Sequence, residues 1–199
     1  MNTENTVPKV SFGNLKLPKD TMIFNIPAVT TCPFKTAFCA RSCYALKAER
    51  LYKAVKPARE HNLKITKRED FAEVMTLIIE RHAHKIKRVR IHESGDFYRQ
   101  SYLSAWYSIA KRFPDITFYA YTKSFWLDFS GKPDNFKLIA SFDKTTPADR
   151  RALYEQNKRF FDNTFTVVER VARSTCPADC SICDKCWTKK GLNITVNQH

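Results

Sequence analysis

The sequence has little glycine and no long apolar run. Only four of its 199 residues are glycine, whereas 43% are hydrophobic and 13% are aromatic. This is the composition of a packed globular protein, and it excludes a disordered chain. No stretch approaches the roughly 20 apolar residues that a membrane span requires, and the first residues lack the basic and apolar regions of a secretory signal peptide. The sequence therefore predicts a cytoplasmic protein without a membrane partner.

Cysteine is absent from about 130 consecutive residues in the middle of the chain. All seven cysteines lie in two clusters, the first made of Cys32, Cys39 and Cys43 and the second of Cys176, Cys180, Cys183 and Cys186. An odd number of thiols in a reducing compartment argues against a disulfide framework. We therefore expect all seven side chains to be metal ligands.

The second cluster has the dense spacing C-x3-C-x2-C-x2-C. Close spacing lets several thiolates converge on one ion or cluster, and the C-x2-C-x2-C part resembles the runs that bind [4Fe–4S] clusters in bacterial ferredoxins. Zinc is the alternative occupant, because four thiolates satisfy its tetrahedral geometry. A metal of one of these two kinds is expected here.

The first cluster, C-x6-C-x3-C, supplies three thiols. A closed structural site prefers four protein ligands, so three thiolates indicate a site with one open coordination position. Two alternatives remain at this point: the three cysteines are small buried residues, or they join one C-terminal cysteine in a single four-ligand site. The sequence thus predicts one or two [4Fe–4S] clusters.

Alternating strand and helix patterns predict an α/β fold. Strands are expected at residues 22–30, 88–93, 116–121, 136–142 and 165–170. Helices are expected at residues 45–62 with a bend at Pro57, 66–84 with a Thr66–Glu69 capping box, 103–110, and 146–159 with Thr146 as the cap. The order strand, helix, strand implies right-handed parallel crossovers.

These elements predict a partial parallel (β/α) barrel of about five to six strands. The barrel is expected to span residues 22–171, after an extended lead-in over residues 1–21. Residues 172–199 are expected to form a Cys-rich metal-binding segment packed on the barrel, and the protein is expected to be a monomer.

Polar side chains follow each expected strand, at the edge where ligands bind in parallel α/β folds. We expect four of them to act as acid, base or anion-binding groups in catalysis, namely His92, Glu93, Asp96 and Lys123. Residues expected to bind a cofactor are Glu93, Ser94, Gly95, Asp96, Thr122, Ser124, Ser141 and Arg170. The alternative interpretation of each residue is an ordinary turn former or cap.

Basic residues outnumber acidic ones, 34 against 20, which gives a formal charge of +14. Such an excess favours polyanions such as nucleic acid, although it is equally typical of a merely soluble surface. Basic helices over residues 47–67 and 81–90 would contact phosphate. One alternative hypothesis is therefore a nucleic-acid-binding module with structural iron–sulfur or zinc sites, and another is an electron-transfer protein with a redox partner.

Several sequence blocks resemble a phage-encoded family, the mycobacteriophage gene-product-eighty-eight type. The blocks are Thr-Cys-Pro at 31–33, Ser-Cys-Tyr-Ala at 42–45, Ser-Gly-Asp-Phe at 94–97, Phe-Tyr-Ala-Tyr-Thr-Lys-Ser at 118–124 and the closing Cys-x2-Cys-x2-Cys-Trp. The resemblance covers most of residues 22–187. It implies a phage protein in the cytoplasm of an infected or lysogenic host, and it supplies no mechanism.

Three cysteines after the first strand of a partial barrel are also similar to radical S-adenosylmethionine enzymes. In that family a three-thiolate [4Fe–4S] cluster leaves one iron free for S-adenosylmethionine, and the loop at residues 93–96 would bind the methionine amino group. The spacing departs from that family, which uses C-x3-C-x2-C; here that spacing occurs at Cys176, Cys180 and Cys183. The leading hypothesis is an iron–sulfur-dependent enzyme that catalyses a reductive or radical reaction.

Overall fold

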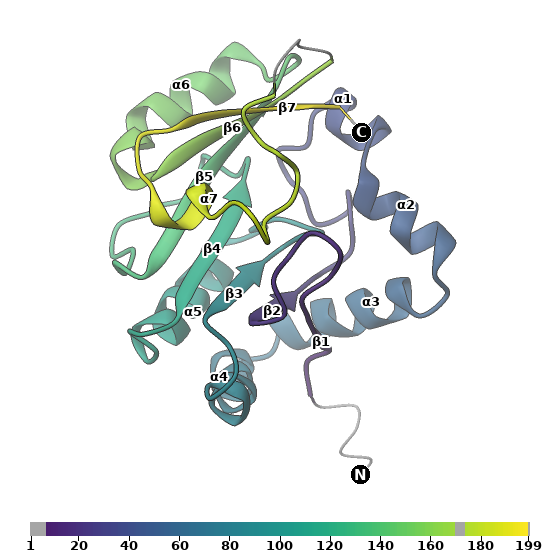
Figure 1. Cartoon of the computed structure of the whole chain (residues 1–199), viewed down its shortest axis with the longest axis vertical. Coiled ribbons are helices and arrows are strands. Elements are labelled where there is room, and N and C mark those ends of the chain that lie inside the picture. The colour runs from purple at the N-terminus through teal and green to yellow at the C-terminus, as the bar shows by residue number, and fades with distance from the viewer. Residues whose placement is uncertain (1–6, 170–173, 199) are drawn as a thin grey trace.

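The computed structural model describes residues 7–169 and 174–198, which form an α/β fold around one seven-stranded sheet (Figure 1). The strands are β1 (Val10–Phe12), β2 (Thr21–Phe24), β3 (Arg88–Ile91), β4 (Thr117–Thr122), β5 (Phe136–Asp143), β6 (Asn163–Val168) and β7 (Asn193–Asn197). They lie side by side in sequence order. β1 is antiparallel to β2, and every other neighbouring pair is parallel.

Helices connect most of the strands. They are α1 (Ala37–Arg41), α2 (Tyr44–Leu51), α3 (Val55–Thr66), α4 (Phe71–His82), α5 (Gln100–Lys111), α6 (Ala148–Asn157), the 3-10 turn η2 (Lys158–Phe160) and α7 (Lys185–Thr188). None of the helices in the described part of the chain combines the length and the apolar character that crossing a membrane requires.

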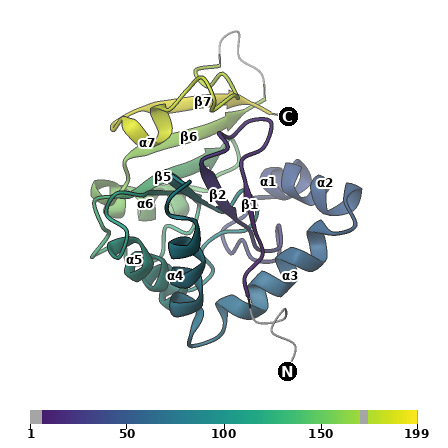
Figure 2. The same ribbon diagram turned by 60° about the horizontal axis from the view of Figure 1, so that its bottom comes forward.

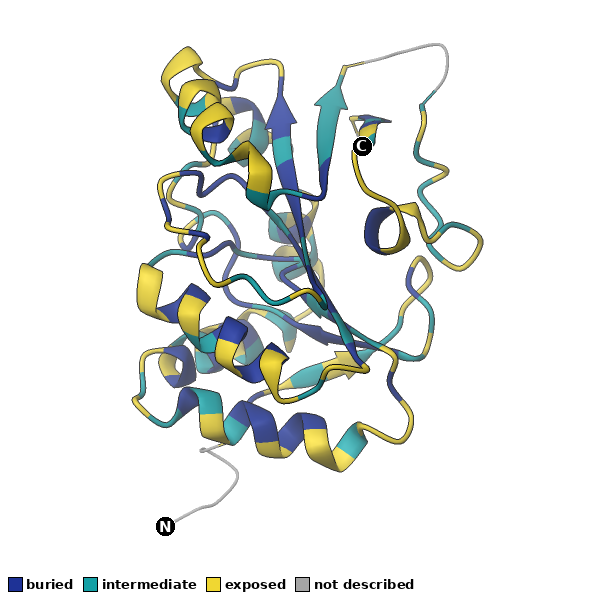
Figure 3. Cartoon of the chain, turned by 90° about the vertical axis from the view of Figure 1, so that its left-hand side faces the viewer, coloured by how far each residue is buried: buried dark blue, intermediate teal, exposed yellow. Residues whose placement is uncertain are grey.

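Right-handed crossovers between strands in sequence order place the connecting helices on one face of the sheet. Figure 3 shows this layer on one side of the strands, and the segment that contains α7 on the other. Side chains of β4 alternate accordingly: Phe118 and Ala120 pack against the helices, whereas Tyr119 contacts Trp187 of α7. We call the side of the sheet that α7 covers the inner face.

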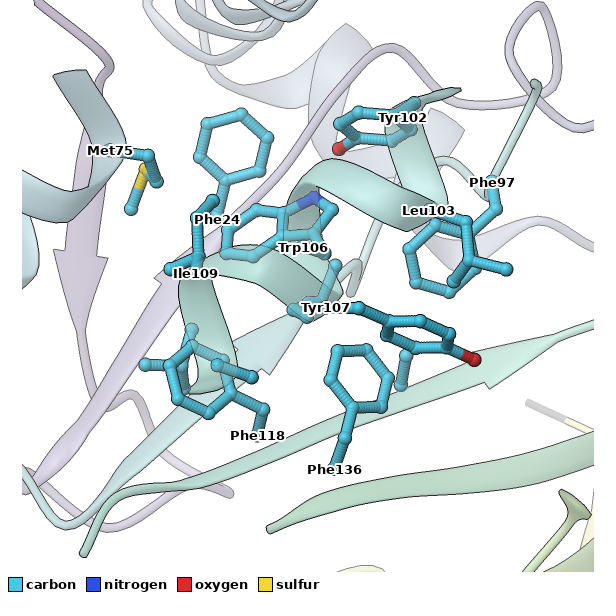
Figure 4. Packing of buried hydrophobic residues seen from close by; sticks show 14 of the residues in the cluster. Phe24, Met75, Phe97, Tyr102, Leu103, Trp106, Tyr107, Ile109, Phe118 and Phe136 are labelled. Atoms are coloured by element: carbon cyan, nitrogen blue, oxygen red, sulfur yellow. The ribbon is translucent and has the colours of Figure 1, made fainter. Parts of the chain in front are cut away.

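The main core lies between the sheet and helices α4 and α5 and is rich in aromatic side chains (Figure 4). Trp106 of α5 is fully buried and makes edge contacts with Phe24 of β2 and Phe71 of α4, at centroid distances of 5.3 and 5.6 Å. Edge-to-face contacts of this kind are each worth about 1 kcal/mol beyond the burial itself. They anchor the first parallel strands, whose ends carry the candidate site.

The predicted α/β class is confirmed, and the sheet has more strands than expected. β1 lies inside the stretch expected to be an extended lead-in, and β7 lies inside the Cys-rich segment. Strand β1 has only three residues and gives little local signal. Strand β7, Asn-Ile-Thr-Val-Asn, does alternate polar and apolar residues as a half-buried strand should, and this signal was overlooked. β1 and β7 are the edges of the described sheet and do not pair with each other, so the sheet is open.

Some element boundaries differ from the sequence-based expectations. The helix expected at residues 45–62 is two helices, α2 and α3, and Pro57 causes no bend because it lies in the first turn of α3. A first-turn amide has no partner within the helix, so proline is tolerated there. The first strand ends at Phe24 and not near residue 30, because Asn25 accepts hydrogen bonds from the amides of Glu93 and Ser94.

Two expected helix caps are wrong. Thr66 is the last residue of α3, its hydroxyl donates to the carbonyl of Leu63, and α4 begins at Phe71 with Asp70 as its N-cap residue. Thr146 accepts a hydrogen bond from the amide of Asp143, and Pro147 occupies the cap position of α6. In both places the threonine hydroxyl forms a hydrogen bond with a nearby backbone group before the next helix begins. That hydrogen bond competes with helix capping for the same hydroxyl group.

Candidate metal centres

The first three cysteines lie on the connection that leaves the carboxyl end of β2. Cys32 closes a turn in which its amide donates to the carbonyl of Val29 at 3.3 Å. Thr36 caps α1 by accepting a 3.0 Å hydrogen bond from the amide of Cys39. Cys43 is the N-cap residue of α2. A tight turn, a capped helix and a second helix start therefore hold the three thiols.

The three thiols are close enough for their charges to interact. Burial, together with the charges of Asp96, Cys39 and Cys43, raises the pKa of Cys32 to about 12. Burial also raises the pKa of Cys39, whereas the ammonium group of Lys123 lowers it. Buried thiols of this kind lose their protons when a cation binds them. Three thiols are therefore a donor set of the kind that an iron–sulfur cluster takes.

The loop after β3 packs directly against this connection. Gly95 has a φ of +92°, and a Cβ added there would lie 2.3 Å from Cγ1 of Ile26 and 2.8 Å from Oγ1 of Thr31. The hydroxyl of Ser94 donates to the carbonyl of Ile26 at 2.8 Å. Ser94 and Gly95 therefore position the connection that carries the first cysteines. The Ser94 hydroxyl already donates its hydrogen bond to Ile26.

Asp96 is buried at the end of the same loop. Its carboxylate accepts hydrogen bonds from the hydroxyl of Thr122 at 2.6 Å and from the amides of Lys123 and Phe97 at 2.9 and 2.7 Å. Burial raises the pKa of Asp96 to about 6, although these hydrogen bonds act in the opposite direction. Asp96 thus joins the ends of β3 and β4 and places a titratable group beside Cys32.

Lys123 links the site to β5. Its ammonium nitrogen lies 3.1 Å from Oδ2 of Asp143 and donates to the carbonyl of Ser141 at 3.1 Å. Asp143 also accepts a 2.8 Å hydrogen bond from Thr36. Burial acts to raise the pKa of Asp143, but Lys123 and the surrounding hydroxyl groups outweigh it and hold that pKa below its usual range. Ser141 contributes its carbonyl here.

His92 and Glu93 point away from each other. His92 has a φ of +68°, which turns its ring toward the helices, where Nε2 lies 2.8 Å from the Tyr102 hydroxyl. Burial, followed by the charge of Arg90, lowers the pKa of His92 to about 3. Glu93 instead accepts a 2.8 Å hydrogen bond from Asn14. His92 is therefore a core histidine in this arrangement, apart from the thiols.

The two remaining cofactor candidates differ in what can be said of them. The Ser124 hydroxyl is buried and has no hydrogen-bond partner among the described residues, while its amide donates to the Thr122 hydroxyl at 2.9 Å. Arg170 lies outside the described residues. Ser124 is thus a free buried donor at the end of β4, one residue beyond Lys123.

The second cysteine cluster covers the inner face of the sheet. Trp187 of α7 packs on Tyr119 with a centroid distance of 5.0 Å, and Cys176, Cys180 and Cys186 belong to the same apolar cluster. The amide of Cys180 donates to the carbonyl of Lys16 at 2.8 Å. This segment is therefore fixed both to the centre of the sheet and to the loop between β1 and β2.

Arg90 projects from β3 into the space beneath this segment. Its guanidinium group lies 4.0 Å from the ring centre of Tyr121 and 5.1 Å from that of Tyr119. Burial raises the pKa of Cys180 to about 11 and raises that of Cys186, and in both cases Arg90 acts to lower it. Arg90 is thus a buried cation close enough to Cys180 and Cys186 to lower the pKa of both thiols.

Two buried polar atoms on the inner face lack partners among the described residues: Nε of Arg90 and the hydroxyl of Tyr119. Buried donors are normally satisfied, so both fit a site that receives a negatively charged group. Thiolate-bound metal centres carry such a charge, roughly −2 for four thiolates around zinc or a [4Fe–4S] cluster.

Within residues 7–169 and 174–198, no three His, Cys, Asp or Glu side chains form a group that could hold one metal ion. In a [4Fe–4S] cluster each thiolate binds a different iron, so the cysteine sulfurs lie farther apart than the ligands of a single ion.

An open surface hollow of about 340 Å³ lies beside Cys180 and Cys183, with Arg88 and Trp187 in its lining.

The sequence-based interpretation assigned neither Arg90 nor Asn25 to the candidate site. The signal for Arg90 was present, because Arg88 and Arg90 alternate with the apolar Val89 and Ile91 and must share one face of β3. Asn25 gave no local signal, since its partners, the amides of Glu93 and Ser94, are nearly 70 residues away in the sequence.

Strained backbone conformations occur in or near both cysteine segments and at the start of the loop after β3. The non-glycine residues with positive φ in the described part of the chain are Val29, His92 and Ala178. Val29 lies three residues before Cys32, and Ala178 lies between Cys176 and Cys180. Residues held in this region cost on the order of 1–3 kcal/mol each and cluster at functional sites. Strain thus accompanies both cysteine segments and the start of the loop after β3.

Comparisons with known proteins agree with the family resemblance. The family model described as "Gene product 88" matches residues 2–174, a range that contains the first three cysteines and ends before Cys176. The "Gene 88 protein" of Mycobacterium phage L5 is 34% identical over 150 residues, 68% of this chain and 62% of the relative. That of Mycobacterium phage D29 is 33% identical over 172 residues, 66% of this chain and 71% of the relative.

The chain therefore spans less than two thirds of the length of the phage L5 relative. No solved structure matches it. The family model covers most of the chain, and both relatives carry the same description. The chain therefore belongs to the gene product 88 family.

Proposed function

We propose that this chain is an iron–sulfur protein with an open three-thiolate [4Fe–4S] site at Cys32, Cys39 and Cys43. The observation that carries the proposal is the position of these thiols at the carboxyl end of β2, where their charges interact with one another and with Asp96 and Lys123 at the ends of the next strands. Three thiolates leave one iron of a cluster open to a further ligand.

The order of the sheet is compatible with a radical-enzyme-like architecture. Strands β2 to β7 are parallel and follow one another in sequence order, and every helix except α7 lies on the opposite face from the C-terminal cysteine segment. A partial (β/α) barrel would have the same strand order. Active sites in such folds lie at the carboxyl ends of the strands. S-adenosylmethionine is the cofactor that this architecture would take, and the chemistry it supplies is the generation of a radical.

The protein residues at this edge would bind and orient a ligand. Asp96 and Lys123 supply a titratable carboxyl group and a cation beside the thiols, and the buried Ser124 hydroxyl is an additional donor. The helix-facing ring of His92 is not part of this group.

A second centre at Cys176, Cys180, Cys183 and Cys186 completes the proposal. The support for it is the pair of unpartnered buried donors, Arg90 Nε and the Tyr119 hydroxyl, that face this segment. A [4Fe–4S] cluster is our first choice for its occupant and zinc is the alternative.

The proposal can be tested by anaerobic purification followed by iron, sulfide and zinc analysis. The full chain should hold about eight iron atoms, and replacement of either cysteine set by alanine should leave about four. Stoichiometric zinc without iron would overturn the iron–sulfur assignment. Loss of all metal from both variants would instead show a single shared centre.

Electron paramagnetic resonance of the reduced protein then tests the open site. Addition of S-adenosylmethionine should change the spectrum of the full chain and of the variant that lacks the C-terminal cysteines. An unchanged spectrum in both would exclude this cofactor and leave a closed or differently liganded cluster. A reversible redox couple without turnover would instead indicate an electron-transfer protein.

A further inference from the structure

A basic surface with exposed apolar side chains begins immediately after the first cysteine cluster. We call it the basic α2 surface, and it consists of Arg41, Lys47, Arg50, Leu51, Tyr52 and Lys53, all of which are exposed. Helix α2 lies at the outer edge of the molecule in two views (Figures 1 and 2). Lys47, Arg50 and Leu51 lie on one side of that helix because three- and four-residue steps return to the same side.

The surface carries positive charge that the protein itself does not neutralise. Residues 41–59 contain six basic residues and one acidic residue, Glu49. The carboxylate of Glu49 is buried, where it pairs with Arg59 at 2.9 Å and accepts a hydrogen bond from the amide of Ala28. Among the described residues, no carboxylate forms an ion pair with Arg41, Lys47, Arg50 or Lys53. The fold thus buries the one carboxylate of this segment against Arg59 and leaves Arg41, Lys47, Arg50 and Lys53 exposed.

Two large apolar side chains lie among these cations. Leu51 is 62% exposed and Tyr52 is 63% exposed. Neighbouring exposed apolar groups provide a candidate contact area for a partner. An exposed aromatic ring in a segment with the exposed cations Arg50 and Lys53 matches the combination that binds single-stranded nucleic acid, in which cations contact the phosphates and the ring stacks on a base. A duplex keeps its base faces stacked internally and offers no such contact.

The other basic stretch, at residues 81–90, is more engaged with the protein. Arg88 forms an ion pair with Asp20 and lies 5.2 Å from the ring centre of Trp187. Lys85 lies 4.4 Å from the ring centre of Phe12. Among the described residues, Arg41, Lys47, Arg50 and Lys53 of the basic α2 surface form neither an ion pair nor a cation–ring contact of this kind.

We propose that the basic α2 surface binds single-stranded nucleic acid. Its position adds a structural connection to the candidate site, because Cys43 is the N-cap residue of α2 and the Tyr44 hydroxyl donates to the carbonyl of Glu93 at 2.6 Å. A strand bound along α2 would lie next to the first cysteine cluster. The proposal itself does not require that either cluster be present.

The test is fluorescence anisotropy of the full chain with labelled single-stranded DNA and RNA of about 20 nucleotides, and with a duplex of the same sequence. Single strands should bind more tightly than the duplex, and the affinity should fall as salt is raised. The double variant Lys47→Ala/Lys53→Ala should reduce the magnitude of the log–log salt slope by about 1.4, since each phosphate contact on a single strand contributes about 0.7.

Tyr52 variants test the stacking contact. Tyr52→Ala should weaken single-strand binding at least about 5-fold, while Tyr52→Phe should retain it, because base stacking needs the ring and not the hydroxyl. Lys111→Ala is the matched control, since Lys111 is an exposed cation at the end of α5, on the other side of the molecule from α2 (Figure 1). It should leave the affinity nearly unchanged.

Three results would overturn the proposal: no binding of single strands, equal effects of Tyr52→Ala and the Lys111→Ala control, or duplex binding as tight as single-strand binding. Vesicles that contain phosphatidylserine provide a competing partner. Binding to the vesicles but not to the oligonucleotides would assign this surface to a membrane instead. Iron analysis of the same samples shows separately whether the metal proposal holds.

Discussion

The hydroxyl of Thr36 donates a hydrogen bond of 2.8 Å to Oδ2 of Asp143. The same hydroxyl accepts the hydrogen bond that caps α1, from the amide of Cys39. A single buried side chain therefore ties the helix that carries Cys39 to the end of β5. Because Lys123 binds the same carboxylate, this contact connects the first cysteine cluster to two strands.

Replacement of Thr36 by valine should lower both stability and metal retention. The variant keeps the shape of the side chain but loses the cap and leaves the Asp143 oxygen with one donor fewer, so the free energy of unfolding should fall by about 1–3 kcal/mol. Urea unfolding and iron content after anaerobic purification are the two measurements. Thr36→Ser keeps the hydroxyl and should retain most of the stability and most of the iron. Unchanged iron content in the valine variant would show that metal retention does not depend on this cap.

Gly95→Ala should be strongly destabilising. The added Cβ meets Ile26 at 2.3 Å, and the φ of +92° is unfavourable for alanine, so a loss of about 2 kcal/mol or more is expected. Gly131→Ala is the control, since Gly131 also has a positive φ of +77° but has nothing within 4 Å of an added Cβ. The difference between the denaturation midpoints of the two variants measures the effect of the steric contact with Ile26. Equal losses of stability would show that the backbone strain alone is responsible.

His92 should make the protein sensitive to acid. Its pKa is lowered from the ordinary 6.5 to about 3 by burial, so between these values the unfolded chain binds a proton that the native chain does not. Stability from this residue should therefore fall as the pH drops through about 6 toward 3, by up to about 1.4 kcal/mol per pH unit. Urea midpoints measured from pH 7 to pH 4 should show a shallower decline for His92→Phe.

Asp96 should act in the opposite sense over part of that range. Burial raises its pKa from 3.8 to about 6, so the native chain binds the additional proton and stability from this residue falls as the pH rises from about 4 to 6. Asp96→Asn removes this contribution. The variant should therefore show a steeper loss of stability on acidification than the unmodified chain, and parallel pH profiles would contradict the assignment.

Arg90 should set the potential of the C-terminal centre if that centre is an iron–sulfur cluster. Removal of the buried positive charge makes the reduced, more negative state less favourable, so Arg90→Met should lower the midpoint potential by on the order of tens of millivolts. The measurement is a redox titration in a chain whose first three cysteines are replaced by alanine. Arg90→Lys, which keeps the charge, should shift the potential less.

The candidate site residues could be located from the sequence because the signals that mark them are local. The spacing of the cysteines, the turn residues at 94–97 and the alternation of Tyr119 with Phe118 and Ala120 are all properties of neighbouring residues. Hydrophobic periodicity likewise located α4 and α5 and the central strands. Such signals depend on only a few consecutive backbone conformations.

The orientation of His92 shows where local prediction ends. Alternation along β3 would place this side chain on the inner face with Arg88 and Arg90. A positive φ reverses it, so the ring reaches Tyr102 among the helices. The left-handed conformation is unfavourable for histidine in isolation, and only the packing of the loop after β3 can maintain it.

The sequence by itself determined the α/β class, the family, the two cysteine clusters and the basic character of the chain. The tertiary structure decided that Thr36 meets Asp143 across 107 residues, that Arg90 lies close to Cys180 and Cys186, and that the acid of α2 turns inward to Arg59. The physical reason is that periodicity assigns a side chain to a face of its own strand or helix. Its partner depends on how the crossovers stack those elements, which no local pattern encodes.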